Sequence, residues 1–346
     1  SRYVTQLVTH LDQIETGKLN FKIYTDSETH DLTDFTRIPI NYDTTVRRIL
    51  WDTIGFTRTT QSTDVDLIHS PDKGPIYRGD TPIVTTIHDL LPFYFAEERG
   101  FLNRRYWQVL LQRQVNISDA IICVSHSTKN DIIDRFGTSG EKIYVTHLGT
   151  DLSPPSKKDI RSIMKKYDIL DSQFNILYVG NYDQRKNVDK IVRACRSIHQ
   201  DFPELRLILA GSNPPKSTLN SIAGEFHDKI SYLGYVPDSE LGSLYAAVDV
   251  FTYPSEYEGF GLPIIEAMAC GTPVITSNKS SLPEVGGEAA VTLDPSDLST
   301  LSAAIRRMCE DDEFRKTMQD ASLRRAQDMR WDQTARETVR VYHELL

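Results

Sequence analysis

The sequence predicts an α/β protein built from two Rossmann-like domains, each with a doubly wound parallel sheet. Apolar, β-branched runs alternate with helical patterns along almost the whole chain, which is typical of parallel sheets with crossover helices. The chain has 346 residues, more than one hydrophobic core usually serves. A polar, proline-bearing stretch at 148–155 separates two sets of strands and reads as a linker. We therefore expect two domains facing each other across a cleft that binds a ligand.

Each half of the chain supplies its own set of expected strands. The first half contains five, at 21–25, 65–69, 82–87, 120–124 and 142–146. The second half contains six, a full Rossmann-like count, at 174–179, 205–209, 229–233, 249–253, 273–276 and 289–293. Ligands bind beyond the carboxyl ends of strands in open parallel sheets. Function is therefore expected in the loops that follow Ile87, Val179, Leu209, Leu233 and Tyr253.

The start of the chain predicts a helix, because residues 2–11 place Tyr3, Leu7 and Leu11 on one face. Doubly wound domains open on a strand, so we expect a strand and a loop before Ser1. No apolar run approaches the roughly 20 residues that a membrane helix needs, and we expect a cytoplasmic protein. The four cysteines lack metal-type spacing, which favours reduced thiols in that compartment.

Charge and spacing exclude two classes of ligand. The formal net charge is -9 and the pI is about 5.5, whereas a nucleic-acid partner favours a basic protein. The Asp-x-Asp pattern at 64–66 could bind a metal ion, but it stands at the start of an expected strand, the wrong end for a doubly wound site. We therefore expect no nucleic-acid partner and no metal ion.

The richest loop follows the expected strand 249–253 and covers residues 254–271. Pro263 fits the first helical turn, where its missing N–H is not needed. Gly259 and Gly261 let backbone N–H groups approach a ligand next to a helix N-terminus, which favours negative charge. Glu258 and Glu266 can face one pocket, and a carboxylate accepts from two neighbouring hydroxyl groups of a ribose or a hexose. The loop therefore predicts a site for an anionic ligand that carries sugar hydroxyls.

These two glutamates have seven residues between them, and they are flanked by Pro-Ser before and Ala-Met-Ala-Cys-Gly-Thr-Pro-Val after. The pattern closely resembles the signature of retaining glycosyltransferases of family 4, the glycosyl transferases group 1. The resemblance covers nearly the whole chain and is most specific at 175–283. It implies the GT-B architecture, with Glu266 on the ribose hydroxyls and Glu258 on the donor sugar. The backbone around the following residues would hold sugar and phosphate: Gly259, Phe260, Gly261 and Leu262.

A second loop, at 180–187, follows a strand and opens a helix. Gly180 frees the turn, and the adjacent cations Arg185 and Lys186 could neutralise a departing diphosphate. By resemblance, family members carry a lysine at the place of Lys186. Many relatives have arginine directly after the glycine, where this chain has Asn181, so Arg185 is the expected substitute for the missing cation.

Weaker signals come from three other strand ends. Gly211, Tyr235 and Val236 resemble family segments that hold the nucleotide base, although strand-ending glycines are also ordinary turns. His88 follows a strand of the first domain, where relatives carry a histidine close to the donor sugar, and it is expected to be catalytic. Asp89 could orient the His88 imidazole or cap the next segment. Both alternatives stay open.

The resemblance also implies which domain binds the acceptor and which binds the donor. Residues 1–152 would bind the acceptor and would be completed by a C-terminal helix at 331–346, and residues 153–330 would bind the nucleotide sugar. We expect a retaining hexosyltransferase, independent of metal and cofactor, with mannose and a guanosine or uridine donor favoured. The acceptor would be a saccharide or a lipid-linked saccharide. A peripheral membrane contact by helix 103–114 competes with ordinary packing of that helix.

The sequence also allows two functions other than a glycosyltransferase. A nucleotide-sugar epimerase can share the architecture, but it needs acid and base residues flanking the sugar, where the sequence offers mainly His88. A non-catalytic partner subunit is disfavoured because Glu258, Glu266 and Lys186 are all present.

Overall fold

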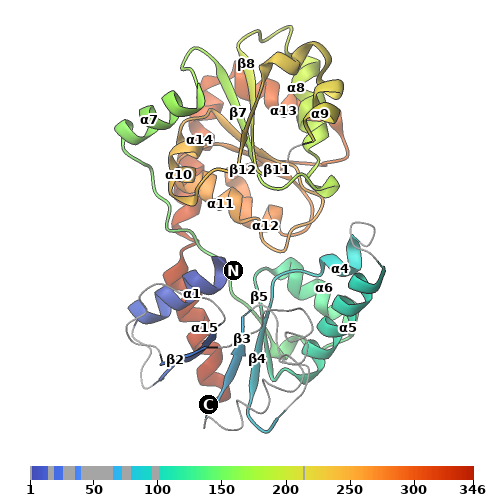
Figure 1. Cartoon of the computed structure of the whole chain (residues 1–346), viewed down its shortest axis with the longest axis vertical. Coiled ribbons are helices and arrows are strands. Elements are labelled where there is room, and N and C mark those ends of the chain that lie inside the picture. Colours follow the sequence, from blue (N-terminus) through green and yellow to red (C-terminus); the bar gives the residue numbers. More distant parts are fainter. Residues whose placement is uncertain are drawn as a thin grey trace. The chain divides into compact units, whose positions relative to one another are not determined.

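The computed structural model of the chain describes residues 2–14, 19–25, 36–39, 65–71, 79–95, 101–212 and 215–346. Contacts divide the chain into two compact units (Figure 1). Unit 1 comprises Ser1–Gly149 and Trp331–Leu346, and unit 2 comprises Thr150–Arg330. Both units contain parallel sheets, so the expected α/β class with two parallel-sheet domains is confirmed. In the described part of the chain, no helix is long and apolar enough to cross a membrane.

Unit 2 is built on a six-stranded parallel sheet of order β12-β11-β10-β7-β8-β9. This order reverses between β7 and β10, which makes these neighbouring strands the topological switch point of a Rossmann-like sheet. The strands are buried runs rich in valine, isoleucine and leucine, as expected of a sheet covered on both faces. Their bounds are β7 (Phe174–Val179), β8 (Leu205–Ala210), β9 (Ile230–Gly234), β10 (Val250–Tyr253), β11 (Val274–Ser277) and β12 (Ala290–Leu293).

Helices cover both faces of this sheet (Figure 1). Helices α8, α9 and α13 pack as one group, and α7, α10, α11, α12 and α14 form the other. The bounds are α7 (Lys157–Tyr167), η3 (Gln184–Lys186), α8 (Val188–Ile198), α9 (Lys216–Ala223), η4 (Gly224–Lys229), α10 (Asp238–Ala246), α11 (Leu262–Ala269), α12 (Leu282–Gly286), η5 (Gly287–Ala289), α13 (Leu298–Glu310) and α14 (Asp312–Gln327).

Unit 1 has a four-stranded parallel sheet of order β3-β4-β5-β6 and a separate parallel pair, β1-β2. The strands are β1 (Lys22–Thr25), β2 (Thr36–Pro39), β3 (Ile68–Ser70), β4 (Ile83–Ile87), β5 (Ala120–Cys123) and β6 (Ile143–Val145). The helices are α1 (Arg2–Gln13), α4 (Leu91–Tyr94), α5 (Phe101–Ile117), α6 (His126–Phe136), η2 (Gly140–Lys142) and α15 (Trp331–Leu345). All expected strands are found within a few residues of their predicted positions, and β2 was not expected.

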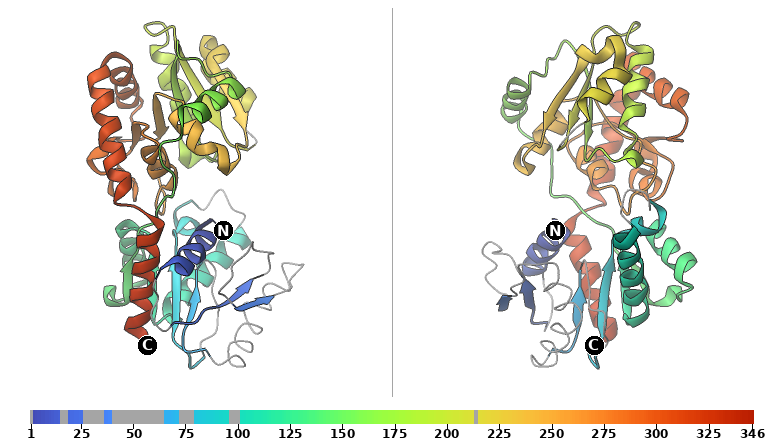
Figure 2. Two further views of the ribbon diagram at one scale, coloured as in Figure 1. Left: turned by 90° about the vertical axis from the view of Figure 1, so that its left-hand side faces the viewer. Right: turned by 45° about the vertical axis from the view of Figure 1, so that its right-hand side comes forward.

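The C-terminal helix α15 is part of unit 1 and packs against α1 (Figure 2). Trp331 at its start is only 2% exposed, and its ring lies 6.1 Å from that of Tyr3. Thr334 donates a hydrogen bond of 2.7 Å to the carbonyl of His147. The first and last helices therefore close the same core.

Candidate functional site

Two loops of unit 2 meet at the switch point of its sheet, and we call them together the charged loop cluster. Residues 180–187 follow β7, and residues 254–261 follow β10. The backbone N–H of Glu256 donates to the carbonyl of Arg185 at 2.8 Å. Asn187 Nδ2 donates to the carbonyl of Pro254 at 2.9 Å. These bonds join the loops where an open parallel sheet binds its ligand.

Glu258 is the centre of the cluster. Its Oε1 accepts from Arg185 Nη1 at 2.7 Å and from Ser255 Oγ at 2.7 Å, and it also accepts from Lys186 Nζ. The three charged side chains are 7% to 13% exposed. Oε2 takes part in none of these three bonds. One carboxylate oxygen is therefore fixed by two cations and a hydroxyl group.

Burial and the neighbouring charges shift the pKa values of Glu258, Lys186 and Arg185. Burial raises the pKa of Glu258, but Lys186 and Arg185 lower it more, so its net pKa is below the ordinary value. Burial lowers the pKa of Lys186 more than Glu258 raises it. The pKa of Arg185 is raised by Glu258 although burial acts against this. The other two acids of these loops are paired separately, Asp183 with Arg185 at 3.4 Å and Glu256 with Lys190 at 3.3 Å. Two cations therefore meet at one oxygen of Glu258, and this local pair of positive charges suits an anionic ligand.

Aromatic rings from the sheet support Lys186. Its ammonium nitrogen contacts the Tyr253 hydroxyl and lies 4.6 Å from the Tyr253 ring centroid. Tyr253 stacks between Tyr178 and Phe251, with ring centroids 6.0 Å and 5.8 Å away. The hydroxyl group of Tyr253 therefore accepts from the buried ammonium group and fixes its position. The end of β10 thus fixes the lysine that the loop after β7 supplies.

The turn into α11 depends on Gly261. Its φ of 104° favours glycine, and a Cβ there would lie 2.8 Å from Leu282 Cδ2. Pro263 stands in the first turn of α11, as expected. The carbonyl of Phe260 accepts from Ser281 Oγ at 2.7 Å. The glycine loop is therefore shaped by close packing against the segment that follows β11.

Glu266 lies on α11 with 2% exposure. Tyr245 of α10 donates to its Oε2 at 3.2 Å, whereas the cations contact Glu258. The two glutamates that the sequence pairs therefore have different surroundings: Glu258 is set among charges, and Glu266 beside a buried phenol.

Glycines expose the backbone at the ends of β7, β8 and β9. Gly180 N–H donates to Ala210 O at 3.0 Å, and Gly211 N–H donates to Gly234 O at 2.8 Å. A Cβ on Gly211 would lie 1.9 Å from the carbonyl oxygen of Gly180, so this close approach requires glycine. The next side chain, Tyr235, is 71% exposed, while Val236 is buried.

His88 lies in unit 1, directly after β4 as expected. Its Nε2–H donates to the carbonyl of Pro71 at 2.9 Å, and its ring meets the Tyr3 ring edge-on at 4.6 Å. Asp89 Oδ1 accepts from the backbone N–H of Leu91 at 2.9 Å, so this contact supports the capping alternative. The bond to Pro71 places the proton of a neutral His88 on Nε2.

Behind His88 lies a neutral group that we call the histidine network: His69, Thr86, Tyr3 and Tyr342. His69 Nε2 is hydrogen-bonded to Thr86 Oγ1 at 2.8 Å and Nδ1 to Tyr342 OH at 2.6 Å. Tyr3 OH lies 3.2 Å from the same Thr86 oxygen. Burial, then the proximity of His88, lowers the pKa of His69 to about 3. The network therefore joins α1, β3, β4 and α15 without charge at neutral pH.

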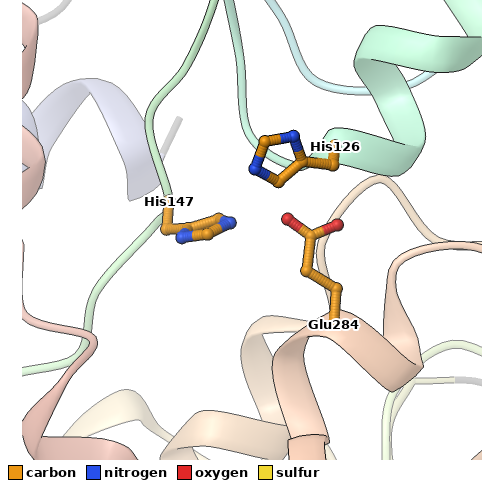
Figure 3. Close-up of side chains that lie close together, drawn as sticks. All are labelled: His126, His147 and Glu284. Atoms are coloured by element: carbon orange, nitrogen blue, oxygen red, sulfur yellow. The ribbon is translucent and has the colours of Figure 1, made fainter.

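Figure 3 shows two other histidines of unit 1, His126 and His147. The rings of His126 and His147 meet edge-on, with centroids 6.0 Å apart. Ser125 is the N-cap of α6, and its Oγ accepts from the backbone N–H of Thr128 at 3.0 Å. Glu284, drawn in the same figure, belongs to α12 of unit 2. The first residue of the Asp-x-Asp pattern, Asp64, lies outside the described residues.

Four side chains to which sequence analysis assigned no role contact the charged residues of this cluster or the backbone of Glu258. Ser255 and Tyr253 contact Glu258 and Lys186 directly. Ser280 and Ser281 donate to the carbonyl of Glu258 at 2.6 Å and 2.9 Å. The position of Ser255 three residues before Glu258 was a usable signal. The two serines after β11 are distant in sequence, and only the fold brings them to the loop.

Comparison with known proteins identifies similar sequences over both units. The family model described as "Glycosyl transferases group 1" matches residues 159–325, and the model described as "Glycosyltransferase Family 4" matches residues 1–154. O-antigen chain mannosyltransferase B of Escherichia coli is 35% identical over 268 residues, which are 75% of this chain and 69% of that protein. MMP alpha-(1->4)-mannosyltransferase of Mycolicibacterium hassiacum is 28% identical over 285 residues, 77% of this chain and 66% of that protein.

Solved structures resemble the whole chain at lower sequence identity. WaaG, a glycosyltransferase involved in lipopolysaccharide biosynthesis, superposes with a TM-score of 0.75 and 17% identity, over 98% of this chain and 94% of that one. A glycosyltransferase from Rickettsia africae ESF-5 gives a TM-score of 0.77 with 17% identity, over 99% and 94% of the two chains. At this identity the likeness establishes the fold.

Proposed function

This chain belongs to the group 1 glycosyltransferases of family 4 and has their GT-B fold, and from that premise we propose a specific reaction. The protein is a hexosyltransferase of glycan synthesis. The proposed donor is a nucleoside-diphosphate hexose, with mannose favoured, and the proposed acceptor is a saccharide or a lipid-linked saccharide. The similarity to O-antigen chain mannosyltransferase B supports the choice of mannose.

The observation that carries the proposal is the meeting of two cations, Arg185 and Lys186, on one carboxylate oxygen of Glu258. Arg185 and Lys186 are fixed on Oε1 of Glu258 before any ligand arrives, so their charge need not reorganise when a diphosphate binds. Preorganised charge aimed at the site where negative charge develops is the most effective electrostatic aid to a reaction. The departing diphosphate carries that charge. The two cations would thereby take the part that a metal ion plays in other transferases.

Within this proposal each neighbouring group has a role. Glu258 accepts hydroxyl groups of the donor sugar through Oε2, while Oε1 stays on the cations. Glu266 binds the ribose, and the backbone of 259–262 binds phosphate at the start of α11. Gly180, Gly211, Tyr235 and Val236 line the side where the nucleoside lies. A base that stacks on the exposed ring of Tyr235 would gain binding energy whichever base it is, because every base has an aromatic face.

We propose that the configuration at the anomeric carbon is retained. Attack would come from the face that the diphosphate leaves, and a phosphate oxygen would take the acceptor proton. Unit 1 is assigned the acceptor and His88 a part in catalysis. Because its Nε2–H is engaged with Pro71 O, the other nitrogen, Nδ1, is the one that remains to accept a proton or a hydrogen bond from the substrate.

The test is transfer from guanosine- and uridine-diphosphate hexoses to a panel of mannose-containing oligosaccharides, followed by NMR of the product. We expect transfer from one donor, with the donor's anomeric configuration kept. Lys186→Ala and Glu258→Ala should each lower kcat/KM at least about tenfold, or about 1.4 kcal/mol. An inverted product would contradict the proposed mechanism, and unchanged activity in both variants would contradict the site.

A further inference from the structure

Among the described residues, three that are not glycine have left-handed backbone conformations: Asp168, Asn187 and Ser280, with φ of 54°, 55° and 53°. Asparagine and aspartate visit this region more readily than other residues that carry a Cβ. Serine lacks that preference, so Ser280 is the most strained of the three. Strained backbone persists where the surroundings enforce it and is often found at functional sites.

Two of the three residues hold the same loop. Asn187 Nδ2 donates to Pro254 O and to Glu256 Oε1, both at 2.9 Å. Ser280 Oγ donates to Glu258 O at 2.6 Å. The third, Asp168, ends α7 as its C-cap and is exposed. Left-handed backbone therefore coincides with contacts to the loop that carries Glu258.

We propose that Ser280 is a positioning residue for Glu258, held in its strained conformation so that its hydroxyl group fixes the Glu258 backbone. The role deepens the function proposed above and rests on it. Ser280 follows the fully buried strand β11, whose end is fixed by the bond from Asn278 N–H to Leu293 O at 2.7 Å. A rigid strand thus supports the hydroxyl, and the hydroxyl supports the glycine loop.

The carboxylate of Glu258 has to be placed accurately. Glu258 Oε1 has to meet Arg185, Lys186 and Ser255 together. The glycines on the far side, Gly259 and Gly261, leave the loop backbone free to move unless something holds it. Ser280 holds it at the carbonyl of the glutamate itself by the shorter of two bonds, 2.6 Å against 2.9 Å from Ser281, which is shared between this carbonyl and that of Phe260. Small losses of alignment at a reacting centre are costly even when the residue touches no substrate.

Two substitutions at the same position separate positioning from stability. Ser280→Ala and Ser280→Gly both remove the hydroxyl, but only glycine adopts the left-handed conformation without strain. We expect kcat to fall about fivefold in both variants. The melting temperature of the glycine variant should be higher than that of the alanine variant by about 2 °C. Activity that is restored in Ser280→Gly, or unchanged in both variants, would overturn the proposal.

Asp168 supplies the matched control, because it has the same backbone conformation in an exposed helix cap. Asp168→Gly and Asp168→Ala should show the same order of melting temperatures, with kcat unchanged. A loss of activity in Asp168→Ala equal to that in Ser280→Ala would mean that strain anywhere in unit 2 lowers activity, and it would overturn the positioning role.

A double-mutant cycle tests whether Ser280 acts through Glu258. In the Glu258→Gln background, Ser280→Gly should lower kcat by less than about twofold, because the group it positions is already altered. Fully additive losses would overturn the proposal. If the wild type transfers no sugar from any donor, the proposed function fails. If the wild type is active and depends on Glu258, but Ser280→Gly is as active as the wild type, only the positioning role fails.

Discussion

In unit 2 a group of buried charged side chains lies in the loops beyond the sheet, whereas in unit 1 a buried polar network on strands β3 and β4 is neutral. The charged loop cluster keeps Lys186 and Arg185 on Glu258. The histidine network keeps His69 uncharged between Thr86 and Tyr342. Buried charge requires partners, and buried neutral groups require only hydrogen bonds. The charged groups of unit 2 support the proposal that it binds an anionic donor, and the neutral network of unit 1 has a structural role in its core.

The largest expected effect comes from removing one cation of the cluster. Lys186→Ala should weaken binding of a nucleoside diphosphate about 100-fold, or about 2.7 kcal/mol, because a buried preorganised charge is lost. His88→Ala should lower transfer but change that binding less than about twofold. Isothermal titration of both variants checks the contrast. Equal losses of binding in the two variants would contradict the assignment of the diphosphate to the cations of unit 2.

The next effect concerns the close approach at the strand ends of unit 2. Gly211→Ala forces a Cβ against the carbonyl of Gly180, and the backbone must shift to avoid it. We expect unit 2 to lose about 2 kcal/mol of unfolding free energy, measured by urea denaturation. The matched control is Gly234→Ala, because its own φ is positive but a Cβ there meets nothing within 4 Å. Gly211→Ala should lose more stability than Gly234→Ala, both because of the clash and because its φ of 151° suits alanine less well than the 70° of Gly234. Equal losses would contradict this expectation.

The third prediction uses the pH dependence of unit 1. The pKa of His69 falls from 6.5 in the unfolded chain to about 3 in the folded protein. Between these values the unfolded state binds more protons, so stability falls as the pH falls from 6.5 toward 3. Titration of His69 changes the unfolding free energy by at most about 1.4 kcal/mol per pH unit.

His69→Gln removes the titrating group, so its unfolding free energy should change less between pH 6.5 and pH 4 than that of the wild type. Calorimetry at several pH values measures both slopes. Equal slopes for the variant and the wild type would show that His69 takes up no proton on unfolding between pH 6.5 and pH 4. The fold would then not hold His69 neutral in this range.

The smallest effect is expected at the nucleoside side of unit 2. Tyr235→Ala should weaken nucleoside-diphosphate binding about fivefold, or about 1 kcal/mol, by removing a stacking surface. Stability should change by less than about 0.5 kcal/mol, because the side chain is 71% exposed. Tyr94→Ala, at an exposed site of unit 1, should leave binding unchanged. A Tyr235 variant that binds as the wild type does would place the base elsewhere.

The sequence predicted the strands of both units because long buried runs such as 174–179 and 205–209 carry a local signal. The short strand β2 was missed, since four residues ending in Pro39 show no clear period. Glu258 and Lys186 were found from their motifs. Their meeting on one oxygen, and the support from Ser280 and Tyr253, were not predictable, because these contacts join loops 22 to 73 residues apart.

We propose that the charged loop cluster binds the diphosphate of the donor, and binding of ligands that differ only in phosphate tests this. The wild type should bind a nucleoside diphosphate at least about 100-fold more tightly than the parent nucleoside, by isothermal titration. In Lys186→Ala this ratio should shrink to about tenfold or less. A wild type that binds both ligands equally, or a ratio that stays the same in Lys186→Ala, would show that the cluster does not bind the diphosphate.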